Sequence, residues 1–114
     1  MTGDRVDDAI RRAIGGDADA VAWIVAHVDT TDVALVIVMA ALHERDPIRL
    51  DRARSMASTS RDRHVVEIAR AHLDGRSDLV DVLARDHLVD HPDSLIVAWI
   101  ASDAVRKQQL KEGY

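Results

Sequence analysis

A run of ten apolar residues, Val33 to Leu42, constrains the fold of this chain more than any other feature. A helix that crosses a membrane needs about 20 such residues, so this run is too short to do so. As a helix it is apolar on nearly every side, which is typical of a helix buried in a globular core. The sequence therefore predicts a central buried helix from about Val33 to Arg45, ended by Asp46-Pro47.

The residues available for the core favour helices throughout. Hydrophobic residues make up 47% of the 114, but there is no Phe, one Tyr and two Trp, so Ala, Val, Ile and Leu must fill the interior. Alanine suits closely packed helices because of its small size and high helix propensity. Five Gly and two Pro are few for a chain built on β-turns. We expect one all-α domain over residues 1–114.

Apolar residues recur at helical spacing along the rest of the chain. Gly15-Gly16 and Asp74-Gly75 are typical helix ends, and Asp17 and Ser60 are expected N-caps. Seven short helices joined by turns of two to five residues indicate stacked antiparallel helical hairpins. Residues 107–114 are polar and are expected to form a frayed tail. Besides 33–45, the expected helices are Asp4 or Asp8 to Ile14, one following Asp17 to about Val28, Pro47 or Ile48 to about Met56, Arg61 to Leu73, Ser77 to Val89, and Leu95 to at least Arg106.

Several classes of enzyme are disfavoured by missing residues. There is no cysteine, which excludes disulfides, thiolate catalysis and cysteine-based zinc sites. Gly15-Gly16 lacks the following Gly or Lys of a phosphate-binding loop, and His43-Glu44 has Pro47 where a zinc protease needs its second His. We expect no enzyme and no cofactor. The N-terminus lacks the apolar stretch of a signal peptide, so a cytoplasmic protein is expected.

The charge distribution bears on the kind of partner. The net charge is −5, and an acidic chain of this kind is not expected to bind nucleic acid. Residues 44–63 differ, with six Arg against four acids. This segment is either a local contact for an anion or an ordinary solvated surface.

The segment from Gly75 to Ser94 resembles the second helix of a tetratricopeptide repeat. A turn glycine precedes the helix, an apolar stripe runs along it, and Pro92 followed by Asp-Ser ends it. Upstream, Val65, Ile68, Ala69 and His72 have the large, large, small and large spacing of the family's first helix. The resemblance is clearest over residues 61–106. It implies a right-handed superhelix of antiparallel helix pairs that binds a protein or peptide without catalysis.

In the register of that repeat, four residues are expected on the inner, partner-binding face. Arg63 and Arg70 are seven residues apart and so share one side of a helix. Two guanidinium groups there could bind a carboxylate or an acidic peptide. The alternative is that both are solvated and paired with neighbouring acids (Asp62, Glu67 or Asp74). The four predicted residues are Arg63, Val66, Arg70 and Leu73.

The histidines raise a different possibility. His87 and His91 are four apart on one helix, beside Asp86 and Asp90, and such a pair can share a metal. Two imidazoles from one helix are too few, however, and the spacing indicates no third ligand, so a metal-binding protein is the weakest alternative. His64 and His72, two turns apart, are expected in a surface or interface role.

Oligomerisation is the other alternative. A homo-oligomeric regulatory bundle could form if the Val33–Leu42 helix, or the apolar face near Trp99, packed against a second copy to give a homodimer.

Overall fold

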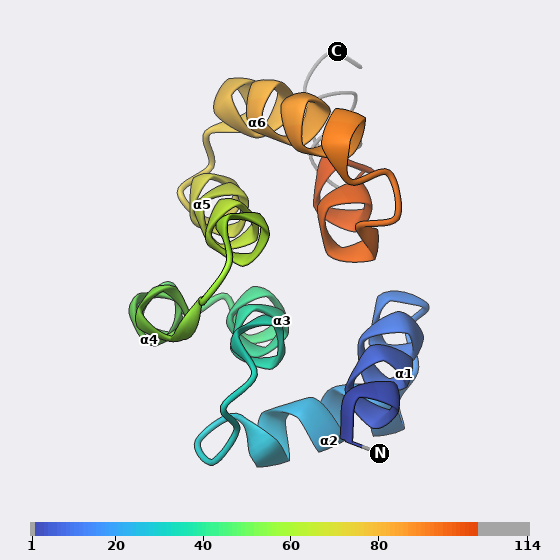
Figure 1. Cartoon of the computed structure of the whole chain (residues 1–114). Helices are drawn as coiled ribbons and strands as arrows, with labels where there is room; N and C mark the ends of the chain where they lie inside the picture. The colour runs from blue at the N-terminus through green and yellow to red at the C-terminus, as the bar shows by residue number, and fades with distance from the viewer. Residues whose placement is uncertain (1, 103–114) are drawn as a thin grey trace, which may run out of the picture.

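The computed structural model describes residues 2–102, and these form helices and turns without any strand (Figure 1). The prediction of an all-α fold is confirmed. A seventh helix follows six others and is described over residues 95–102. The six are α1 (Thr2–Ile14), α2 (Ala18–His27), α3 (Ala34–Glu44), α4 (Ile48–Met56), α5 (Ser60–Leu73) and α6 (Ser77–Asp90).

The helices pack mainly as consecutive pairs. The most extensive contacts join α3 to α4, α5 to α6 and α1 to α2, and α3 also contacts α1, α2 and α5. In Figure 1 the 95–102 helix, coloured orange-red, follows α6 and lies on the side of the molecule that faces α1. The first and last described helices therefore lie on the same side of the molecule, next to α3 and α5 (Figure 1).

The predicted central helix is α3, and its bounds lie within one residue of those expected. Eight of its residues are buried, and five in succession, from Ile37 to Ala41, have no exposed surface. A helix that is apolar on all sides can be buried in this way only if other helices surround it, as α1, α2, α4 and α5 do here. Within residues 2–102, no helix combines the length and the apolar character that crossing a membrane requires.

The helix ends agree with the sequence at some positions and differ at others. Asp17 is the N-cap of α2, as predicted, and accepts hydrogen bonds from the backbone of Asp19 and Ala20. The prediction that Ser60 caps α5 was wrong. Thr59 has the extended backbone that a cap needs, and its hydroxyl accepts from the Asp62 amide at 3.1 Å.

At the two ends of the chain, one predicted boundary differs from the structure and the other lies outside the described residues. The first helix begins at Thr2, before both predicted starts. The predicted end of the last helix at or beyond Arg106, and the expected tail over 107–114, lie outside the described residues.

A substitution at Gly75 tests the turn between α5 and α6. Gly75 has a φ of +75°, and in this turn the amide of Arg76 donates to the carbonyl of Ala71 at 2.9 Å. A Cβ at Gly75 would meet no atom within 4 Å, so the cost of Gly75→Ala is the left-handed backbone alone. We expect the free energy of unfolding to fall by about 1 kcal/mol.

Gly15→Ala is the matched control, because Gly15 has no positive φ and its Cβ would make ordinary contacts. Urea denaturation followed by circular dichroism measures both variants. Equal losses at the two positions would contradict the backbone argument.

Candidate functional site

A groove opens between the first and last described helices. Its volume is about 540 Å³, and residues of α1, α3, α5 and the segment 93–96 line it. Leu95 is an exposed part of this lining, with 45% of its surface accessible to solvent. The apolar side chains that a partner can reach here are Leu95 and the half-buried Leu35, because the other apolar lining residues are at most 5% exposed. Its apolar lining residues are Ile10, Leu35, Val65, Leu95 and Ile96.

The polar lining of this groove is slightly acidic. Arg61 of α5 pairs with Asp93 at 3.2 Å, which fixes the segment before the last helix to α5. The other charged residues of the lining are Asp7, Arg11 and Asp62, and no ion pair of these three is described within residues 2–102. Two carboxylates against one guanidinium leave a net charge of about −1 once the Arg61–Asp93 pair is set aside.

The four residues predicted to bind a partner lie apart from this groove. Arg70 pairs with Asp51 of α4 at 2.5 Å, a partner on another helix that spacing along α5 did not indicate. Arg63 is exposed, and Leu73 is partly buried against the core. Val66 is only 1% exposed, so it can affect binding through packing but cannot contact a partner at the surface.

The residues of α5 that do line the groove are Arg61, Asp62 and Val65. A partner-binding role for Arg63, Val66, Arg70 and Leu73 stays a prediction.

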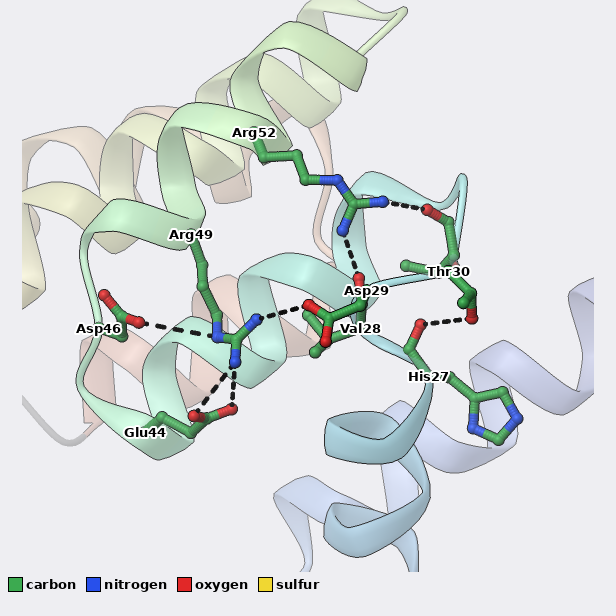
Figure 2. Close-up of polar contacts among 9 residues, drawn as sticks. His27, Val28, Asp29, Thr30, Glu44, Asp46, Arg49 and Arg52 are labelled. Atoms are coloured by element: carbon green, nitrogen blue, oxygen red, sulfur yellow. Dashed lines mark hydrogen bonds and ion pairs between the residues drawn. The ribbon is translucent and has the colours of Figure 1, made fainter.

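Part of the Arg-rich segment 44–63 holds the fold together. Arg49 lies 3.3 Å from Glu44 and 3.4 Å from Asp29, and Arg52 donates to two carbonyl oxygens of the α2–α3 loop (Figure 2). These contacts fasten α4 to the end of α2. The exposed arginines of the segment are Arg45, Arg54 and Arg63, which are the ones left for an external anion.

A second cavity, of about 410 Å³, lies between α5 and α6 and contains three histidines. His87, in the last turn of α6, has its ring centroid 6.3 Å from that of His64 on α5 and 4.9 Å from that of His91. We call these three residues the histidine cluster. The charged and polar residues that share the cavity are Ser60, Arg61, Glu67, Asp86 and Asp90.

His87 is the buried member of the cluster. Only 4% of the surface of His87 is exposed, and neither of its ring nitrogens has a hydrogen-bond partner. Burial lowers the pKa of His87 below its ordinary value of 6.5, and the neighbouring positive charges of His91, His64 and Arg61 lower it further, against an opposing effect of Asp90. The ring is therefore neutral near pH 7, buried and unpaired, which is an unfavourable state for a polar group.

Spacing along one helix did not place His64 of α5 beside His87 of α6. The predicted antiparallel hairpin did contain a signal for this pairing, because His64 lies eleven residues before Gly75 and His87 lies twelve residues after it. Two helices that reverse direction at Gly75 bring such positions opposite each other. His64 and His72, two turns apart on α5, line different cavities, and their surface or interface role stays a prediction.

That third cavity, of about 190 Å³, connects α3 with the last helix. The ring of His43 lies 5.4 Å from that of Trp99, and the Nε2 atom of His43 is buried without a hydrogen-bond partner. Burial lowers the pKa of His43. His43 is therefore a second neutral, packed imidazole.

Two alternatives from the sequence can be compared with this geometry. Within residues 2–102, no group of three or more His, Asp or Glu side chains is arranged to hold a metal ion, and this includes the surroundings of His87 and His91. A homodimer through α3 would require the core to open, because eight residues of α3 are already buried inside the chain.

No protein-family model, curated protein or solved structure matches this chain. Its function has to be inferred from the groove and the cavities themselves.

Proposed function

We propose that the chain is a small tetratricopeptide-like module that binds a protein or peptide and catalyses no reaction. The observation that carries the proposal is the groove of about 540 Å³ between α1, α3, α5 and the 95–102 helix, in which Leu35 and Leu95 are the apolar side chains that a partner can reach. Support for the tetratricopeptide-like arrangement comes from the packing of α1/α2, α3/α4 and α5/α6 as successive pairs.

The groove favours one class of occupant. Leu35 and Leu95 suit a segment with apolar side chains, and the volume of the groove lies within the range of ordinary ligand sites. Once Arg61 is paired with Asp93, the two carboxylates Asp7 and Asp62 outnumber the one remaining guanidinium, Arg11, and this excess negative charge favours a basic side chain on the segment. The proposed ligand is therefore an apolar peptide segment that carries at least one Lys or Arg.

Leu95→Asp tests the groove directly. Peptides would be selected by display from a random library on the purified protein, and their affinities measured by fluorescence anisotropy. We expect the selected peptides to contain apolar residues and a basic residue. We expect Leu95→Asp to weaken their binding about tenfold or more, because a charge replaces the most exposed apolar side chain of the groove lining. Val89→Asp is the matched control: Val89 is 77% exposed on α6 and lies outside the groove lining.

Three outcomes would contradict the proposal: no peptide is selected, the two variants lose affinity equally, or amide shifts on peptide binding map away from the groove. Light scattering addresses the homodimer. If a second copy fills the groove, the unmodified chain is a dimer and Leu95→Asp is a monomer, whereas the peptide proposal requires a monomer in both cases.

A further inference from the structure

The histidine cluster lies in a different cavity from the groove, and peptide binding in the groove gives no reason for its buried histidine. His87 is buried with two unpartnered ring nitrogens at the packed boundary between α5 and α6, beside a cavity of about 410 Å³. We propose that the cluster is a proton-operated latch, in which neutral His87 lets α6 pack against α5 and protonation of His87 releases α6. This proposal does not depend on what occupies the groove.

The burial of His87 makes the packed state selective for the neutral ring. An imidazolium has two N–H donors, and in the packed arrangement neither would find an acceptor. Placing an unpaired charge in such a position is strongly unfavourable. Protonation and the packed position of His87 are therefore in competition.

The neighbouring charged groups do not remove this competition. Those facing the cavity are Arg61, His64 and Glu67 from α5 and Asp86, Asp90 and His91 from α6. Asp90 opposes the lowering of the His87 pKa, but His91, His64 and Arg61 act in the other direction, and burial has the largest effect. None of the three carboxylates makes a hydrogen bond to the ring.

Among the labelled helices, α6 packs against fewer neighbours than α3 does. Among the six labelled helices, α5 is the one against which α6 packs extensively, whereas α3 contacts four others. The cavity lies at the N-terminal end of α5 and the C-terminal end of α6, and His64 in its lining is exposed, so solvent is adjacent to the cluster. Loss of the α5–α6 contact at this end would hydrate His87 without exposing α3.

The direction of the pH effect follows from the lowered pKa. Well above pH 6.5 the ring is neutral whether α6 is packed or released, so protonation does not oppose packing. Below 6.5 the released state takes up a proton that the packed state does not, and the ratio of released to packed molecules rises about tenfold per pH unit. The rise ends when the pH reaches the lowered pKa of packed His87.

Hydrogen exchange measured residue by residue between about pH 5 and pH 7.5, and corrected for intrinsic rates, tests the latch in the full chain. We expect the protection of α6 amides to fall about tenfold per pH unit below 6.5, while that of α3 amides stays higher and changes later. In His87→Leu the fall at α6 should disappear. His27→Leu, a change at an exposed histidine of α2, should behave like the unmodified protein.

A titration of His87 by its ring NMR signals in the unmodified protein keeps the test decisive if His87→Leu does not fold. A pKa at or above 6.5 would overturn the proposal. So would equal opening of α3 and α6 as the pH falls, since that is global unfolding. The same exchange experiment is repeated with zinc chloride at pH 7.5. If zinc increases the protection of α6 amides and His87→Leu abolishes that increase, the cluster is a metal site and the latch proposal is wrong.

Discussion

Replacing Ile37 with Ala is expected to lower the free energy of unfolding by about 3 kcal/mol, within the range found when a buried Ile or Leu is truncated. Ile37 has no exposed surface and lies on α3, which is surrounded by four other helices. The neighbouring side chains cannot collapse into the space from all sides at once, so a cavity remains. Thermal unfolding should shift down by on the order of 10 °C.

Ile48→Ala is the matched control, because it removes the same atoms from a helix position that is 77% exposed. The two variants share the gain in helix propensity from Ile to Ala, so the difference between them isolates burial. We expect Ile48→Ala to change stability by less than about 0.5 kcal/mol. If both variants lose stability by similar amounts, α3 is not the centre of the core.

Secondary structure was largely predictable from this sequence because its signals are local. The all-round apolar character of Val33 to Leu42 allowed no position for α3 other than the interior, and Pro47 and Gly75 marked turns through their own backbone preferences. The cap of α5 was misassigned because Thr59 and Ser60 offer the same hydroxyl chemistry. Which of them has the extended backbone depends on how the α4–α5 turn is folded.

The candidate sites were less predictable, because they depend on contacts between distant segments. The groove needs the return of the 95–102 helix toward α1, and no spacing rule places Leu95 near Ile10. Arg70 was assigned to a binding face from its position on α5 alone, whereas its partner Asp51 belongs to α4. His64 and His87 could have been paired from the hairpin geometry, since both positions are measured from one turn.

Arg52→Ala should be the second most damaging of the proposed substitutions, although Arg52 lies at the surface of α4. One end of its guanidinium donates to the carbonyl oxygen of Val28, at the C-terminal end of α2, and the other donates to that of Thr31 at 2.9 Å (Figure 2). A positive charge at the C-terminal end of a helix is also favourable for the helix dipole. Loss of two charge-assisted hydrogen bonds should reduce the free energy of unfolding by about 2 kcal/mol.

Two further variants separate the geometry of this contact from its charge. Arg54→Ala removes an exposed arginine of the same helix, for which no side-chain hydrogen bond or ion pair is described within residues 2–102, and should change stability by less than about 0.5 kcal/mol. Arg52→Lys keeps the charge but lacks the planar fork that reaches two carbonyls at once, so it should recover less than half of the loss. Full recovery by Lys, measured by urea denaturation, would mean that charge alone is responsible. In that case the link between α4 and the α2–α3 loop would be electrostatic and would weaken as salt is added, which the bidentate contact would resist.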